Sequence, residues 1–287
     1  MSDAPDPTMA ETIAYRPSRR IAGLAVGAHP GRTSGAAAFY RDLVPFEREP
    51  DGRRIDLRAS ARDPFGRLFV RRPDPRNGIT IEIVVDASGS MAFAGRTSRM
   101  RIVRDLCATL AASARVYRDP LGLTWCGGDG TVQRIMPGLR RGIAAEIDAL
   151  LAAASPKGAG HEALLAFAAG LGGRPHLVFL VSDFLLPLPL VETLLRLLAR
   201  HELVPVILRD RGELEDLPPW GLAELRDLET GRRRLTLLRP SLHAAWRSAE
   251  EQRQRRLLDL CHAYGRTPFT IRDRFEPTAL GRHLLAC

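Results

Sequence analysis

The stretch Ile79-Thr80-Ile81-Glu82-Ile83-Val84-Val85-Asp86-Ala87-Ser88-Gly89-Ser90-Met91 decides the fold. It begins with apolar and β-branched residues, which are typical of a buried strand. Strand-like runs follow at 121–126, 132–136, 176–181 and 203–208, and segments with apolar residues at helical spacing lie at 98–118, 143–153, 162–171 and 191–201. This alternation predicts an α/β fold with a doubly wound, mostly parallel sheet and helices on both faces.

The rest of the chain predicts smaller parts around this sheet. Residues before the sheet are rich in arginine and proline and carry only short apolar runs, too few for a core of their own, so we expect them to dock on the sheet with Ile55 and Phe69 buried. The predicted parts are a flexible arm (1–20), an arginine-rich region of small strands and loops docked on the sheet domain (21–78), the sheet domain (79–210) and an α+β extension packed on the same core (211–287). Within the extension we expect strands near 222–228, 235–238 and 269–271 and helices at 242–264 and 278–285.

Composition narrows the class of protein. The chain has 287 residues, 45% of them hydrophobic, which excludes a disordered protein. Its net charge of +9 is divided into excesses of +4, +2 and +3 over residues 1–78, 79–210 and 211–287, and this even spread disfavours a nucleic-acid binder. The sequence has no uncharged apolar stretch of membrane-spanning length and no signal-peptide pattern, so we expect a cytoplasmic location and no membrane partner.

The candidate site follows the first strand of the sheet. Asp86, Ser88 and Ser90 place a carboxylate and two hydroxyls at alternate positions, a pattern that can curl around one hard cation such as Mg²⁺. The alternative is a turn with a helix N-cap, for which Asp and Ser are also favoured. Asp183 follows the strand at 176–181 and would face the same crevice if the two strands are neighbours.

These residues support a resemblance to known proteins. The Asp-x-Ser-x-Ser pattern after a strand, with a later strand-end Asp183, resembles the metal-ion-dependent adhesion site of the von Willebrand factor A domain. The stretch Asp51-Gly52-Arg53-Arg54-Ile55-Asp56-Leu57-Arg58-Ala59-Ser60-Ala61-Arg62, the stretch 66–72 and the Asp227–Gly231 segment before a long helix resemble the Domain of Unknown Function 58 family. The resemblance covers roughly residues 20–287.

The resemblance implies a function without catalysis. It implies a von Willebrand factor A-like, metal-dependent interaction or adaptor module that works with a MoxR-type AAA+ ATPase in the assembly, maturation or metallation of an enzyme complex. One subgroup of the family lies in methanol-oxidation gene clusters. The implied ligands of a weakly held Mg²⁺ or Mn²⁺ are Asp86, Ser88, Ser90 and Asp183, and an acidic group of a client or partner protein completes the metal shell.

One position departs from the family pattern. Where such domains place a threonine before the third core helix, this chain has His161, after Lys157-Gly158-Ala159-Gly160. Imidazole is a poor Mg²⁺ ligand and a better ligand for Zn²⁺ or Mn²⁺, so the metal could differ. The alternative is an exposed histidine beside a helix start.

Two other functions remain open from the residues alone. A phosphatase-like hydrolase could use Asp86 and Asp183, although the second carboxylate expected two positions after Asp86 is Ser88 here. A nucleic-acid binder is the second alternative, weakened by the even charge. In the N-terminal region, arginines 53, 54, 58 and 62 either form a partner surface or pair with the acids at 51, 56 and 63.

Overall fold

The computed structural model describes residues 11–15, 26–30, 40–48, 50–73 and 76–286. The chain divides into two compact units, one holding Met1–Ser18 with Thr80–Cys287 and the other holding Arg19–Ile79. Each unit is described by itself below. The expected docking of the N-terminal region on the sheet therefore stays a prediction.

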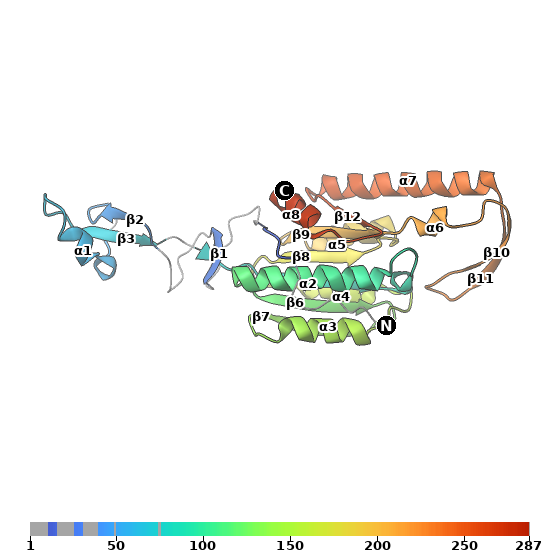
Figure 1. The fold of residues 1–287 in the computed structure, drawn as a ribbon, viewed down its shortest axis with the longest axis horizontal. Coiled ribbons are helices and arrows are strands. Elements are labelled where there is room, and N and C mark those ends of the chain that lie inside the picture. The colour runs from blue at the N-terminus through green and yellow to red at the C-terminus, as the bar shows by residue number, and fades with distance from the viewer. Residues whose placement is uncertain (1–10, 16–25, 31–39, 49, 74–75, 287) are drawn as a thin grey trace. The chain divides into compact units, whose positions relative to one another are not determined.

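The larger unit is built on a six-stranded sheet with the order β12-β9-β8-β5-β6-β7 (Figure 1). Its strands are β5 (Ile81–Ala87), β6 (Leu121–Gly127), β7 (Val132–Gly138), β8 (Leu177–Ser182), β9 (Glu202–Arg209) and β12 (Phe269–Arg272). Only β7, which follows a hairpin turn from β6, runs antiparallel to its neighbour. Every residue of β5, β6 and β8 is buried, as a central strand covered on both faces requires. The predicted mostly parallel α/β sheet is confirmed.

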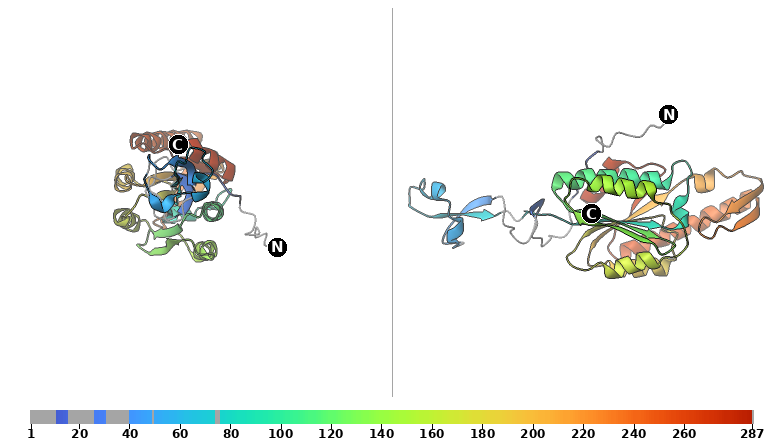
Figure 2. Two further views of the ribbon diagram at one scale, coloured as in Figure 1. Left: turned by 90° about the vertical axis from the view of Figure 1, so that its left-hand side faces the viewer. Right: turned by 90° about the horizontal axis from the view of Figure 1, so that it is seen from below.

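Helices cover both faces of this sheet (Figure 2). They are α2 (Arg99–Tyr117), α3 (Ile143–Ala153), α4 (Glu162–Gly170), α5 (Leu188–Leu197), α6 (Gly212–Glu215), α7 (Pro240–Ala263) and α8 (Pro277–Ala286). One core forms where α4, α5 and α7 bury Phe167, Leu194 and Leu257 against Val178 and Leu180 of β8. Helices α2, α3 and α8 lie on the opposite face (Figure 2). No helix within the described ranges is long and apolar enough to cross a membrane.

A separate two-stranded hairpin precedes α7. Strands β10 (Gly221–Arg226) and β11 (Arg233–Leu238) pair in antiparallel register up to Arg226 and Arg233. Asp227 shapes the tip between them, because its Oδ1 accepts a 2.9 Å hydrogen bond from Glu229 N and its Oδ2 accepts a 2.6 Å bond from Thr230 Oγ1. A tip held by its own side chain can present the next residues in a fixed conformation.

A short N-terminal segment packs within the larger unit. Ile13 and Tyr15 are each 4% exposed. Ile13 N donates a 2.9 Å hydrogen bond to Ser113 Oγ of α2, and Tyr15 Oη donates to Asp119. This part of the stretch expected to be a flexible arm is therefore held against α2, while residues 1–10 and 16–20 lie outside the described residues.

The N-terminal unit contains two small strand pairs. They are β1 (Val26–Pro30) with β4 (Arg76–Asn77) and β2 (Tyr40–Pro45) with β3 (Phe69–Pro73), and α1 (Leu57–Ser60) lies between β2 and β3 in the chain. Val44 and Val70 are paired across β2 and β3 and are buried. Phe69 points to the other side of its strand, and both Phe69 and Ile55 are only half-buried. Within this unit alone the two side chains are therefore not fully buried, and their burial against the sheet stays a prediction.

The arginines of this unit pair only in part. The acids form ion pairs with three arginines, Asp51 with Arg54 at 3.1 Å, Asp56 with Arg71 at 2.8 Å and Asp63 with Arg67 at 3.0 Å. The remaining arginines at 53, 58 and 62 are exposed and form no ion pair with a described residue. Of the four arginines considered from the sequence, Arg54 is thus the one that pairs with a described acid, and the partner-surface interpretation of the other three stays a prediction.

Two histidines at the opposite end of β8 predict acid sensitivity. His176 N donates to His201 Nδ1 at 3.2 Å, and His201 Nε2 lies 3.0 Å from Leu171 O, so His201 is neutral with its proton on Nε2. Burial lowers the pKa of His176 to about 4 and also lowers the pKa of His201. The unfolded chain, with histidine pKa values near 6.5, binds more protons than the folded chain in this window, so stability falls as pH drops from about 6.5 toward 4.

We expect His176→Asn to reduce this loss. Between pH 7 and pH 4.5, the free energy of unfolding should fall by on the order of 1 kcal/mol less in the variant than in the wild type, measured by urea denaturation. His262→Asn, at an exposed position of α7, is the matched control and should follow the wild type. A variant with the full acid sensitivity of the wild type would contradict the prediction.

Candidate functional site

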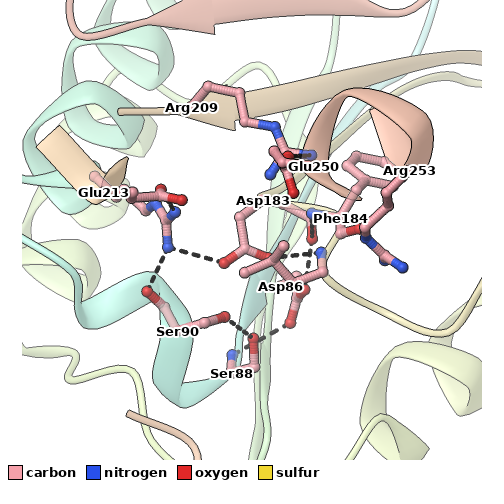
Figure 3. Close-up of polar contacts among 12 residues, drawn as sticks. Asp86, Ser88, Ser90, Asp183, Phe184, Arg209, Glu213, Glu250 and Arg253 are labelled. Carbon is pink, nitrogen blue, oxygen red and sulfur yellow. Dashed lines mark hydrogen bonds and ion pairs between the residues drawn. The ribbon is translucent and has the colours of Figure 1, made fainter. Parts of the chain in front are cut away.

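The parallel register of β5 and β8 brings two carboxylates to one edge of the sheet. Val85 pairs with Val181, so both strands end side by side. Asp86 lies at the end of β5, and Asp183 directly follows β8. In Figure 3, Asp86, Ser88, Ser90 and Asp183 lie together at this edge. The structure therefore brings together the four side chains expected from the sequence.

Asp86 is buried in a network of short polar contacts. It is 2% exposed. Its Oδ2 accepts a 2.6 Å hydrogen bond from Ser182 Oγ, and its Oδ1 accepts a 3.2 Å bond from Ser88 N. Burial raises the pKa of Asp86, and the neighbouring charge of Asp183 adds to this rise. The site is therefore short of positive charge next to Asp86.

The two serines turn their hydroxyls toward one another. Ser88 Oγ and Ser90 Oγ are 3.2 Å apart, and these residues are 1% and 8% exposed. Ser88 stands at the N-cap of the short 3₁₀ helix Gly89–Ala92, but its side chain makes no capping hydrogen bond. The helix-cap alternative therefore does not explain the serine hydroxyls.

Asp183 is held by a buried arginine. Its Oδ2 accepts a 2.9 Å hydrogen bond from Arg99 Nη1, and its Oδ1 accepts a 3.0 Å bond from Leu185 N. Arg99 is 2% exposed, and it also donates to Ser90 O at 2.6 Å and to Glu213. The guanidinium thus shares its single charge between Asp183 and Glu213 and fixes the backbone beside Ser90.

The loop after Asp183 is fastened to α7. Phe184 has φ of 52°, a left-handed conformation that costs a bulky residue energy, and its side chain is fully buried. Arg253 Nη2 of α7 donates to Phe184 O at 2.8 Å and to Leu186 O. Nearby, Arg209 Nη2 forms a 3.2 Å ion pair with Glu250 of the same helix (Figure 3). Helix α7 therefore holds the strained loop in place.

His161 reaches the site from the start of α4. The preceding loop is fixed because Lys157 N donates to Ala87 O at 3.1 Å and Gly89 N donates to Gly158 O at 2.8 Å. His161 is half-buried, and its Nδ1 is buried without a hydrogen-bond partner among the residues that the structure describes. The charge of His161 lowers the pKa of Asp86, so the ring lies within electrostatic reach of that carboxylate. An unpartnered imidazole nitrogen is a candidate ligand atom.

These donors fit a small cation in part. Two adjacent oxygen ligands at about 2.1 Å in an octahedron are about 3.0 Å apart, close to the separation of the serine hydroxyls. Asp86 and the unpartnered nitrogen of His161 add a carboxylate and an imidazole. Asp183 already forms an ion pair with Arg99, so it is less available than Asp86 as a direct ligand of a cation. No group of three or more His, Cys, Asp or Glu side chains arranged for a metal occurs in the described part of the chain, so a cation at this place would also need hydroxyl ligands.

Comparison with known proteins identifies the family. The model of the family "Protein of unknown function DUF58" matches residues 46–256. The chain belongs to the DUF58 family. The family expected from the sequence motifs is thus confirmed.

Three similar proteins accompany this match. An "Uncharacterized protein in moxR 3'region" of Paracoccus denitrificans is 39% identical over 95 residues, which is 33% of this chain and 90% of that protein. An aerotolerance-related membrane protein from Bacteroides fragilis, carrying multiple mutations to serine, is 15% identical with a TM-score of 0.46. The conserved hypothetical protein BatB from Bacteroides thetaiotaomicron is 13% identical with a TM-score of 0.47. Each of these two structures aligns over 73% of this chain and 98% of its own.

Sequence reasoning missed the charged residues that surround the site in this DUF58 chain. Arg99 is the first residue of α2, where the helix dipole favours acids rather than bases. This conflict was the one local signal that Arg99 has a buried acidic partner. Glu213, Arg209 and Arg253 come from distant segments and gave no comparable signal, because their partners are set by the tertiary fold.

We expect Arg99→Ala to destabilise the DUF58 chain strongly. The substitution leaves the buried carboxylate of Asp183 without its cation, which typically costs about 3–5 kcal/mol of unfolding free energy. Arg101→Ala is the matched control, because Arg101 is exposed and its nearest acid, Asp105, is 4.0 Å away, so its loss should cost under about 1 kcal/mol. Equal midpoints of the two variants in urea would show that Arg99 does not stabilise the site.

Proposed function

We propose that this DUF58 chain is a von Willebrand factor A-like, metal-dependent interaction module without catalytic activity. It works with a MoxR-type AAA+ ATPase in the assembly, maturation or metallation of an enzyme complex, with methanol oxidation as one candidate pathway. The observation that carries the proposal is the set of Asp86, Ser88 and Ser90 oxygens gathered at the end of the sheet.

The charge of the Asp86, Ser88 and Ser90 group favours metal-dependent binding of a partner protein over tight storage of a metal ion. Asp86 contacts the Ser88 backbone directly, whereas Asp183 is ion-paired with Arg99. A divalent cation bound there keeps net positive charge and open coordination positions, so it can accept an acidic side chain from a partner protein. Binding of Mg²⁺ or Mn²⁺ to the free protein is therefore weak, and a partner acid strengthens it.

The ATPase partner is supported by the relative from Paracoccus denitrificans, whose name places it in the moxR 3' region. That relative is matched over 90% of its length. This similarity over 33% of the chain, together with the gene region named for that relative, favours a MoxR-type ATPase as the partner of this chain.

The hydrolase alternative lacks such support. It needs a carboxyl group beside Asp86 that is free to transfer protons, yet both oxygens of Asp183 accept hydrogen bonds and one of them is ion-paired. We therefore propose only the metal-dependent interaction with a partner protein.

We expect Asp86→Asn to abolish both metal binding and partner capture. The substitution removes the carboxylate next to the serines, so calorimetry with Mn²⁺ should show at least about a tenfold loss of affinity. Capture of the cognate MoxR-type ATPase should fall to the level seen with EDTA. Because burial already disfavours a charged Asp86, the unfolding free energy without metal should be unchanged or higher.

Asp105→Asn on the exposed surface of α2 is the control and should leave metal binding and capture intact. ATPase capture that survives both EDTA and Asp86→Asn would overturn metal-dependent adhesion.

His161→Thr tests the choice of metal. Imidazole favours Mn²⁺ over Mg²⁺, whereas a threonine hydroxyl is a hard oxygen ligand. We expect the ratio of Mn²⁺ to Mg²⁺ affinity to fall in the variant, with Mg²⁺ binding unchanged or stronger. Calorimetry with each metal gives both numbers, and an unchanged ratio would remove His161 from the ligand set.

A further inference from the structure

The tip of the β10–β11 hairpin lies directly on the candidate metal site. A Cβ placed on Gly89, between the two site serines, would lie 2.3 Å from Leu228 O and 3.0 Å from Glu229 Cα. Gly89 has no positive φ, so its backbone conformation would tolerate a side chain, and the atoms nearest to such a side chain belong to the hairpin tip. The absence of a side chain at Gly89 therefore allows the close approach of Glu229.

The side chain of Glu229 lies within electrostatic reach of the site. It is half-buried, and burial raises its pKa, while the charges of His161, Asp183 and Asp86 also act on it. The hairpin thus brings an additional carboxylate to the place where positive charge is missing. Asp227 fixes this position through its 2.9 Å hydrogen bond from Glu229 N.

The tip also covers the site. The predicted ligands are at most 8% exposed, so no external side chain reaches them in this conformation. A cavity of about 580 Å³ is lined by residues of the site and of the hairpin together, among them Ser90, Arg99, Leu228 and Glu229. The space next to Ser90 is therefore bounded in part by the chain's own acid.

We propose that Glu229 is an intramolecular ligand of the metal site, which the acidic group of a partner protein has to displace. This inference rests on the proposed metal-dependent function and names the group that occupies the adhesion position in the free protein. A bound cation would hold the hairpin tip closed, and a partner that engages the exposed hairpin competes with Glu229 for the same coordination position.

Glu229→Ala tests this directly with Mn²⁺ alone. If Glu229 is a ligand, the free protein loses about tenfold in Mn²⁺ affinity, and the bound ion gains a water molecule that increases the relaxation of water protons per bound Mn²⁺. Glu224→Ala is the matched control, because Glu224 lies on β10 of the same hairpin with its side chain 53% exposed. It should leave affinity and ion hydration at wild-type values.

Gly89→Ala is a second way to remove Glu229 from the metal site. Its methyl group would displace the backbone of the tip rather than remove the acid, so ion hydration should rise as in Glu229→Ala. Both variants should capture more MoxR-type ATPase than the wild type at equal Mn²⁺ occupancy.

Mn²⁺ binding by the wild type, with unchanged affinity and hydration in Glu229→Ala, would overturn the role of Glu229 alone. Absence of Mn²⁺ binding by the wild type would overturn the proposed metal-dependent function as well.

Discussion

Two carboxylates buried at the ends of neighbouring parallel strands require positive charge close by. The parallel register of β5 and β8 holds Asp86 and Asp183 close together, because Asp86 lies at the end of one fully buried strand and Asp183 directly follows the other. Arg99, the first residue of α2, pairs with Asp183 and also with Glu213. Asp86 is left with hydrogen bonds but no cation, and the serines, His161 and the hairpin tip are all arranged around that deficit.

The sheet was predictable from the sequence because burial leaves a local pattern. Continuous β-branched runs mark strands covered on both faces, and helical spacing of apolar residues marks the helices that cover them. The observed strands at 81–87 and 177–182 lie within two residues of the predicted ranges. The same argument placed the strand-end residues Asp86 and Asp183 at one edge, since carboxyl ends of parallel strands meet there.

The charged surroundings of the site were not predictable in this way. Arg99, Glu213 and Glu229 come from three segments far apart in the chain. Their local sequence does not indicate which residues they contact. The half-buried Phe69 of the N-terminal unit is a separate case. A two-stranded sheet buries one face, and the alternation of side chains puts Val70 rather than Phe69 on it.

The order of the sheet has a consequence for how the chain is made. Strand β12 pairs with β9, yet the segment from residue 210 to residue 268, which contains the hairpin and α7, separates them in the chain. As the polypeptide leaves the ribosome, the apolar β9 keeps an open edge until residue 272 has emerged. A product shortened within this segment would keep that edge unpaired, and other nascent chains could pair with it. Closure of the sheet at its last strand therefore makes completion of the chain a condition for escaping aggregation.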